Sequence, residues 1–357
     1  MAGKKMGRLY KLICIALALS ACTSSRVSFE DLDFMREQII ENHPGMYNHE
    51  DPLFKDELEK AYVKARSNIA NNSGSNQKKL ILSTFAKTFN DAHLWVSWKD
   101  AEKNTPRKLQ NQKFAIKHIS PKIVWITLPT FDIQVDQKKD FEHILQQLLN
   151  LKNKDAIVFD LLGNQGGNSE YSDQIVDYLF DESYASQQRR IANRNVSVDW
   201  RASPGNLIHM REMYARYKSD WMRHVADCIE DSITKHEPYY HAASSEIVYP
   251  TKIVRAHSVK AKIFVIIQPL NVSAALDFID SLKMMEHSIT LIGKTTKADR
   301  LYMEVRTVDL PSGMGTFSYP IKVFRNRPRG DNVPYVPDFE CDAADDNELL
   351  KYVESLT

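Results

Sequence analysis

Several kinds of feature are scarce or missing in this chain of 357 residues. It has four cysteines, and neither a CxxC nor an HExxH segment occurs, so the ligand spacings typical of zinc sites are missing. The formal net charge is +1, without a basic stripe, which argues against a nucleic-acid partner. No apolar run is long enough to cross a bilayer. What is present is an ordinary globular composition, with 43% hydrophobic and 26% charged residues, and enough length for two or three domains.

The N-terminal segment has the pattern of an export signal. Basic residues precede a short apolar run at residues 12–19, and Leu-Ser-Ala-Cys follows, ending at Cys22. This ending resembles the lipobox of bacterial lipoproteins, which implies that residues 1–21 are removed and Cys22 is lipidated. Thr23 is not the aspartate that would indicate retention in the inner membrane. We therefore expect a lipid-anchored protein of the bacterial cell envelope, on the outer membrane. A plain signal peptide with an incidental cysteine is the alternative.

Two further cysteines, Cys228 and Cys341, lie in the body of the chain. A location outside the cytoplasm permits a disulfide between them. A sequence does not show whether two cysteines lie close enough to be bridged. A disulfide and two free thiols therefore both stay open.

The predicted elements form a helical segment followed by an alternation of strands and helices. Apolar residues recur at helical spacing from residue 28, and further helices are predicted at 53–70 and 78–89, before a strand at 94–98. Beyond a polar connector, strands are predicted at 122–131, 156–162, 262–268 and 289–292, with helices at 141–151, 169–180, 274–285 and 345–356, and a hairpin at 303–323. This succession predicts an α/β core. We place a small helical domain at 22–100 and the core domain at 101–357.

Residues 185–255 interrupt this alternation. The segment is rich in Tyr, Trp and Met, and its apolar residues from 207 to 233 have helical spacing. It predicts a helical insertion that covers one end of the sheet. A surface elaboration without a role at the site is the alternative.

Two segments carry the candidate chemistry. IVFDLLGNQGGN, at 157–168, runs from a buried strand into a loop in which Gly166 and Gly167 allow backbone N–H groups to approach a substrate. NVSAALDF places Ser273 between a strand and a helix, where its hydroxyl can face a cleft beside the N–H of Ala274. These patterns predict a nucleophile and an oxyanion site. The alternatives are a serine that caps the helix and an ordinary glycine turn.

A serine nucleophile needs a base and a group that orients the base. His93, in NDAHLWV at the end of the helical segment, is a candidate because an imidazole accepts protons near neutral pH. Asp331, in a late loop after Arg-Gly, is a candidate for the carboxylate that orients the imidazole. A structural or solvated histidine and a solvated turn aspartate are the alternatives.

Taken in order, FNDAHLWV, KIVWITLPTF, FDLLGNQGGN, IIQPLNVSAALDF, LIGKTT and VPYVPDFE resemble the C-terminal processing (tail-specific) peptidase and tricorn-protease family of serine peptidases. The resemblance covers about residues 29–338 apart from the insertion. It implies a ββα superhelix like that of crotonase and Clp protease, preceded here by the helical domain. Many members also contain a PDZ domain, for which residues 101–121 leave no room.

The resemblance also implies roles for individual residues. Ser273 matches the nucleophile, and Gly166 or Gly167, together with Ala274, matches the oxyanion donors. The tricorn-like branch uses a histidine from the N-terminal domain and a late acid, and these positions correspond to His93 and Asp331.

Another branch uses a serine–lysine dyad. Lys294 and Lys297 stand near the corresponding position, but both lack its Gly-Lys-Gly context. A serine–histidine–acid arrangement is therefore preferred.

The expected protein is an extracytoplasmic serine peptidase. It acts on a peptide or protein substrate, contacts the membrane through Cys22 and implies no metal or cofactor, while its oligomeric state stays open. Three departures from the family pattern weigh against activity: Leu162 replaces an arginine, Lys294 replaces a glutamate, and Asp331 is an aspartate where glutamate is usual. A catalytically inactive lipoprotein that binds peptides or other ligands on the same fold is the alternative.

Overall fold

The computed structural model describes residues 27–100, 113–243, 259–341 and 346–356. The predicted signal peptide and Cys22 lie outside these ranges, so the lipid anchor stays a prediction. Among the helices of the described ranges, none combines the length and the apolar character needed to cross a bilayer.

The N-terminal part is helical, as predicted. Its elements are α2 (Phe29–Asn42), the short 3-10 helix η1 (Pro44–Tyr47), α3 (Phe54–Ala70) and α4 (Ser75–Lys87), followed by strand β1 (Trp95–Trp98). Helix α2 begins with a capping box, in which Ser28 accepts a hydrogen bond from the N–H of Glu30 and donates its own N–H to Asp31. A turn at 91–94 leads from α4 into β1, and His93 lies in that turn.

A six-stranded sheet forms the α/β core, with strand order β11-β8-β7-β4-β3-β2. All neighbours in it are parallel except β2 and β3. The strands are β2 (Ala115–His118), β3 (Ile123–Thr127), β4 (Ala156–Asp160), β7 (Lys262–Ile267), β8 (Ile289–Gly293) and β11 (Phe339–Glu340). The central strands β4 and β7 are continuous apolar runs because parallel sheets are buried on both faces.

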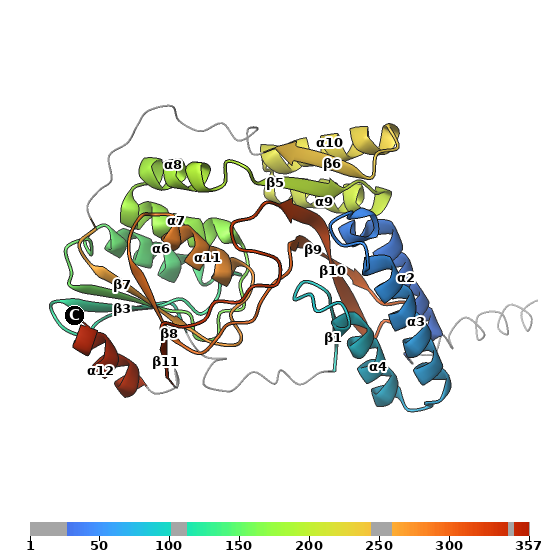
Figure 1. Ribbon diagram of the computed structural model, residues 1–357, viewed down its shortest axis with the longest axis horizontal. Coiled ribbons are helices and arrows are strands. Elements are labelled where there is room, and N and C mark those ends of the chain that lie inside the picture. Colours follow the sequence, from blue (N-terminus) through green and yellow to red (C-terminus); the bar gives the residue numbers. More distant parts are fainter. Residues whose placement is uncertain (1–26, 101–112, 244–258, 342–345, 357) are drawn as a thin grey trace, which may run out of the picture.

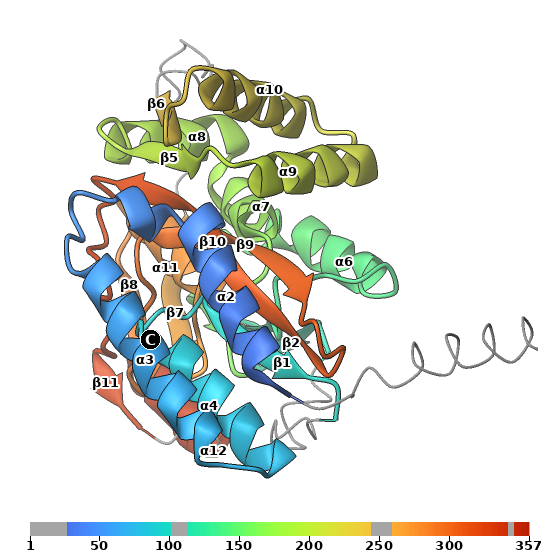
Figure 2. The same ribbon diagram turned by 90° about the vertical axis from the view of Figure 1, so that its right-hand side faces the viewer.

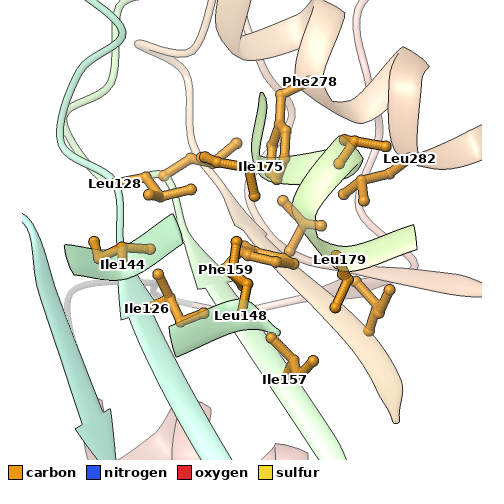
Figure 3. Packing of buried hydrophobic residues seen from close by; sticks show 14 of the residues in the cluster. Ile126, Leu128, Ile144, Leu148, Ile157, Phe159, Ile175, Leu179, Phe278 and Leu282 are labelled. Atoms are coloured by element: carbon orange, nitrogen blue, oxygen red, sulfur yellow. The ribbon is translucent and has the colours of Figure 1, made fainter. Parts of the chain in front are cut away.

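Helices cover both faces of this sheet (Figure 1). One face packs against α6 (Lys138–Leu148), α7 (Ser169–Phe180) and α11 (Ala274–Lys283). In Figure 3, Phe159 of β4 lies between side chains of these helices, including Leu148, Leu179 and Phe278. The opposite face packs against Leu349 and Val353 of the closing helix α12 (Asp346–Leu356). These elements agree with the predicted alternation, with ends that differ by a few residues.

A second, antiparallel sheet is built around the eleven-residue strand β10 (Gly315–Arg325). Strand β9 (Tyr302–Asp309) pairs with β10 as the predicted hairpin. Strand β1 pairs with the first part of β10, where Trp95 lies opposite Ser318, and β5 (Ser197–Arg201) pairs with its last part. Figure 2 shows this sheet behind the N-terminal helices.

The insertion is mainly helical, as predicted, and it also contains two strands that were not predicted. It contains α8 (Glu182–Ala192), α9 (Pro204–Tyr217) and α10 (Asp220–Thr234), but it also supplies β5 (Ser197–Arg201) and β6 (Tyr239–Ala243) to the antiparallel sheet. Trp200 of β5 is fully buried. The aromatic residues that suggested a cap thus contribute in part to a core, and residues 244–255 of the predicted insertion lie outside the described residues.

The N-terminal helices share one apolar core with the antiparallel sheet and the insertion. Leu32 and Ile39 of α2 belong to the same buried cluster as Trp200 and Tyr319. Polar contacts join the same parts, since the Tyr319 hydroxyl donates to Gln38 Oε1 at 2.8 Å. In packing, residues 27–98 therefore form one body with the second sheet, whereas the domain limits taken from the sequence stay predictions.

Cys228, on α10, and Cys341, directly after β11, form no disulfide in the described part of the chain. Of the two alternatives that the sequence left open, the structure has the two thiols.

Candidate active site

Ser273 lies at the turn between β7 and α11 in a strained backbone conformation, with φ 58° and ψ −129°. A positive φ is unfavourable for a residue with a Cβ atom and is often found at functional sites. Although Ser273 occupies the N-cap position of α11, its side chain makes no capping hydrogen bond to the described helix. A capping serine has extended backbone angles and accepts a helix N–H. The geometry therefore favours the nucleophile over the cap.

Two fully buried asparagines fix the turns around Ser273. Asn271 donates to the carbonyls of Leu161 and Asn164 at 2.7 and 2.8 Å, and its Oδ1 accepts the N–H of Gln268 at 2.6 Å. Asn164 in turn accepts the N–H of Gly166 at 2.8 Å. The serine turn is thus tied directly to the glycine loop. The sequence analysis missed both asparagines. They could have been found as polar residues inside the two motifs that carry the candidate chemistry.

The glycine loop touches the serine turn. A Cβ atom on Gly166 would lie 2.6 Å from the carbonyl oxygen of Val272 and 2.9 Å from Ser273 Cβ. Gly166 itself is a poor oxyanion donor because its N–H is already bound to a side chain. The N–H groups of Gly167 and Ala274, in contrast, have no acceptor among the described residues. Of the predicted donors, these two are available.

His93 is buried, with 6% of its surface exposed. Its backbone N–H donates to Asp91 Oδ1 at 2.8 Å, and the same oxygen lies 3.6 Å from the ring atom Nδ1. Neither ring nitrogen has a hydrogen-bond partner among the described residues. In particular, the contacts described for this part of the chain include no hydrogen bond from Ser273 to His93. A buried imidazole with two unused nitrogens is free to take part in proton transfer.

Asp331 was predicted to orient the imidazole of His93, but its described contacts are with other residues. Its Oδ1 accepts the N–H of Leu301 at 2.8 Å, and its Oδ2 lies 3.3 Å from the guanidinium of Arg300. Arg300 also binds Asp51 at 2.9 Å. The side chain of Asp331 is 41% exposed, and no contact to His93 is found among the described residues. The structure therefore does not bring Asp331 to the imidazole, and its role stays a prediction.

Asp299, which the sequence analysis missed, interacts electrostatically with His93. It is fully buried, and its Oδ1 accepts hydrogen bonds from Arg327 at 3.0 Å and from Arg329. Burial raises the pKa of Asp299, but Arg329, Arg327 and His93 together hold it below its ordinary value. His93 therefore lies within electrostatic range of this carboxylate. No residue pattern near Asp299 marks it as part of a site.

Arg329 links this carboxylate to the nucleophile helix. It binds Asp299, and it lies 3.3 Å from Asp277 and 2.9 Å from Asp280 of α11. Asp277, one turn after Ser273, has a pKa raised to about 6, mainly by burial and then by the neighbouring Asp280 and Asp299. An ionic cluster thus runs from α11 toward His93.

The alternative bases have unfavourable surroundings. Lys294 and Lys297 are both exposed. A lysine acts as a base at neutral pH only when burial or a neighbouring cation lowers its pKa. The described residues also contain no group of three His, Cys, Asp or Glu side chains that could hold a metal ion.

Several solved structures are similar to this chain. No curated protein sequence matches the chain. Among solved structures, mature CPAF in complex with lactacystin is similar over 92% of this chain and 98% of that chain, with 12% identity and a TM-score of 0.57. A putative peptidase from Parabacteroides merdae is similar over 92% of this chain and 93% of that chain, with 14% identity and a TM-score of 0.48. The tricorn protease is similar over 91% of this chain and 36% of that chain, with 11% identity and a TM-score of 0.48.

A family model provides the assignment. Peptidase family S41 matches residues 122–337, which contain the glycine loop, the serine turn and the late loop. The match spans more than half of the 357 residues. The chain therefore belongs to peptidase family S41 and has the α/β fold of that family.

Proposed function

We propose that this protein is a serine peptidase in which Ser273 attacks a peptide carbonyl and His93 accepts the serine proton. The observation that carries the proposal is the backbone of Ser273. A strained residue costs about 1–3 kcal/mol, and the fold retains it although the hydroxyl is not used as a cap. Strain of this kind at a strand-to-helix turn is typical of an exposed nucleophile.

The surrounding groups support acyl transfer. When Ser273 Oγ attacks, the carbonyl oxygen becomes negative and is stabilised by the free N–H groups of Gly167 and Ala274, with the positive end of the α11 dipole behind them. His93 takes the serine proton and passes it to the leaving amine. Water then attacks the acyl-serine, with His93 as base again, and the serine is released.

The nucleophile and the base come from different bodies of the fold. Ser273 follows β7 of the parallel sheet, and His93 precedes β1 of the antiparallel sheet. Hydrogen bonds between catalytic groups are often long in substrate-free enzymes and tighten when substrate binds. We infer that a peptide bound between the two bodies completes the contact between Ser273 and His93.

The location and substrate follow from the sequence and the family. The lipobox ending at Cys22 supports an enzyme that is anchored in the bacterial cell envelope. Membership of peptidase family S41 supports a peptide or protein substrate. Asp331, the acid at the position that the family motif gives, is retained as a hypothesis for the residue that orients His93.

Labelling with a fluorophosphonate probe tests the proposed function. We expect the wild-type protein to be labelled and to cleave peptides in a mixed peptide library, and Ser273→Ala to lose both activities. Ser120→Ala is the control, since its hydroxyl accepts backbone N–H groups in a turn away from the serine turn.

A folded wild-type protein that takes no label and cleaves no peptide would contradict the proposal. The inactive ligand-binding lipoprotein would then be the better interpretation, and retention of unmodified peptides by the protein would support it.

A further inference from the structure

We propose that Asp91 and His43 position the imidazole of His93. In this arrangement His43 holds one oxygen of Asp91, and the other oxygen accepts the Nδ1–H of His93. The Nε2 atom of His93 then remains for Ser273. The inference rests on the proposed function, because it concerns the base of that reaction.

The first observation is the burial of Asp91. Its side chain is 1% exposed, and no lysine or arginine forms a salt bridge with it among the described residues. Its Oδ1 lies 3.6 Å from His93 Nδ1, and its Oδ2 lies 4.0 Å from His43 Nε2 without a hydrogen bond to any described group. A buried carboxylate is costly unless it is paired. To stabilise the turn, Asp91 needs only the hydrogen bond from the backbone N–H of His93. Its carboxylate also lies between the two imidazole rings, which indicates a further role.

The second observation is the tautomer of His43. Its Nδ1 accepts the N–H of Gly45 at 2.9 Å and therefore carries no proton. Burial, and secondly the charge of Arg300, hold the pKa of His43 well below its ordinary value, so the ring is neutral. The single ring proton must then be on Nε2, the atom that faces Asp91.

The ring of His43 is also fixed in place. It stacks on Phe54 with a centroid distance of 4.5 Å and meets the edge of Tyr302 at 4.9 Å. Packing on two sides holds the Nε2–H on the side of the Asp91 carboxylate. Because the His43 ring is neutral, it can orient the Asp91 carboxylate without neutralising its negative charge.

The consequence for His93 follows from hydrogen-bond chemistry. An Asp91 oxygen that accepts the Nδ1–H of His93 selects the tautomer in which Nε2 is free to accept a proton, and it stabilises the imidazolium that forms. Both separations exceed the limit of about 3.2 Å for an N–H···O hydrogen bond, so shifts of less than about 1 Å are needed to close them. We expect substrate binding to supply these shifts.

The other two carboxylates are less suited to this task. The oxygens of Asp331 are used by Leu301 and Arg300. Asp299 is bound to two arginines, which makes it a weaker acceptor for an imidazolium. Asp91 is the one of the three that has no cationic partner among the described residues.

Asp91→Asn is the test, because asparagine keeps the shape and the oxygen that accepts the His93 backbone N–H but loses the negative charge. We expect kcat to fall on the order of a thousandfold, with little change in KM, and the rate of fluorophosphonate labelling to fall in parallel. Residual activity should extend to lower pH, because removal of a neighbouring anion lowers the pKa of an imidazole.

Asp31→Asn is the matched control. Asp31 is also fully buried and accepts backbone N–H groups, from Ser28 and Ser312, and no described contact joins it to a histidine. We expect this variant to have a lower Tm and an unchanged kcat. His43→Gln is the second variant, with an expected loss in kcat on the order of tenfold and the same direction of pH shift. If Asp91→Asn does not fold, the kcat and the pH profile of His43→Gln test the proposed arrangement instead.

The possible results separate the inference from the proposed function. A folded Asp91→Asn protein whose kcat and pH profile match the wild type overturns the role of Asp91. If Asp331→Asn is inactive while Asp91→Asn is active, the orienting acid is Asp331. If the wild type is not labelled, or if Ser273→Ala keeps its activity, the proposed function fails, and the role of Asp91 fails with it.

Discussion

The parallel sheet and the antiparallel sheet contribute to the candidate site in different ways. The parallel sheet supplies the proposed nucleophile and oxyanion donors through backbone geometry, with Ser273 and Gly167 in the loops that follow two neighbouring strands. The antiparallel body supplies the proposed base through side chains, with His93 near charged residues from separate parts of the chain. The half of the candidate site that is built from backbone groups depends on the residues that form its turns. The half that is built from side chains depends on the burial and charge of those side chains. The predictions below test this difference.

The largest effect is expected from the base itself. His93→Ala should lower kcat on the order of a thousandfold or more, as does the loss of a member of a catalytic triad. Lys294→Ala and Lys297→Ala should have small effects because both lysines are exposed. Steady-state kinetics on a peptide substrate give the measurement. An inactive lysine variant beside an active His93→Ala would instead assign the activity to a serine–lysine dyad.

Asn271→Ala tests whether the turn that carries Ser273 must be held rigidly for activity. The change leaves the Asn164 carbonyl and the Gln268 N–H without their partner, at a cost of about 1–3 kcal/mol for each unsatisfied group. The Leu161 carbonyl loses one of its two donors and keeps the N–H of Asn164. Displacement of Ser273 by about 1 Å should reduce kcat/KM on the order of a hundredfold. Thermal unfolding and kinetics measure the two effects.

Asn72→Ala is the control for this variant, since Asn72 is only half-buried and donates to one backbone carbonyl in an exposed hydrogen bond. Equal losses in both variants would show that the buried turn has no special role.

Gly167→Ala tests the close approach of the glycine loop. A Cβ atom there would lie 2.1 Å from backbone atoms of Phe131 and Asp132, so the loop must shift relative to that segment. We expect loss of activity together with a lower Tm. Gly313→Ala is matched in having a positive φ, but its Cβ meets open space and should cost only about 1–2 kcal/mol. Full activity in Gly167→Ala would argue against an oxyanion site in this loop.

The smallest effect concerns the ionic cluster between the two bodies. The pKa of Asp277 is raised from 3.8 to about 6 in the folded state, so the native protein holds this proton at pH values where the unfolded chain has lost it. The free energy of unfolding contributed by Asp277 is therefore highest at low pH and decreases as pH rises through this window. Asp277→Asn should make the decrease shallower. Urea unfolding at several pH values measures the slope, and an unchanged slope would contradict the prediction.

The sequence predicted those parts of the fold that local patterns determine. β4, β7, α7 and α11 were found because each has a clear apolar pattern and ends in a turn signal. Strand β5 was missed because it pairs with β10, far away in the chain, and β6 was missed because it pairs with β5 across two intervening helices. The helical spacing of the neighbouring residues concealed these short strands.

For the site, the motifs led to Ser273, the glycine loop and His93, and the structure adds what motifs do not contain. Asp331 was chosen by its place in a motif, but the residues that surround an imidazole are set by tertiary packing. Asp91 precedes His93 by two residues and looks like a turn residue in the sequence. His43 stands in the segment NHPG, which also predicts a turn. Both residues are candidates because they are buried, and the sequence does not indicate that burial.

The pairing of β1 with β10 also has a consequence for the order in which the protein matures. Trp95 lies opposite Ser318, so β1 cannot pair until nearly the whole chain has been synthesised. Contacts between distant parts of a sequence form slowly, and chains fold from their N-terminal end as they emerge. The serine turn and glycine loop are complete before β10 appears, whereas the surroundings of His93 are completed afterwards. A chain that still lacks its last strands thus contains the proposed nucleophile but not the complete surroundings of the proposed base.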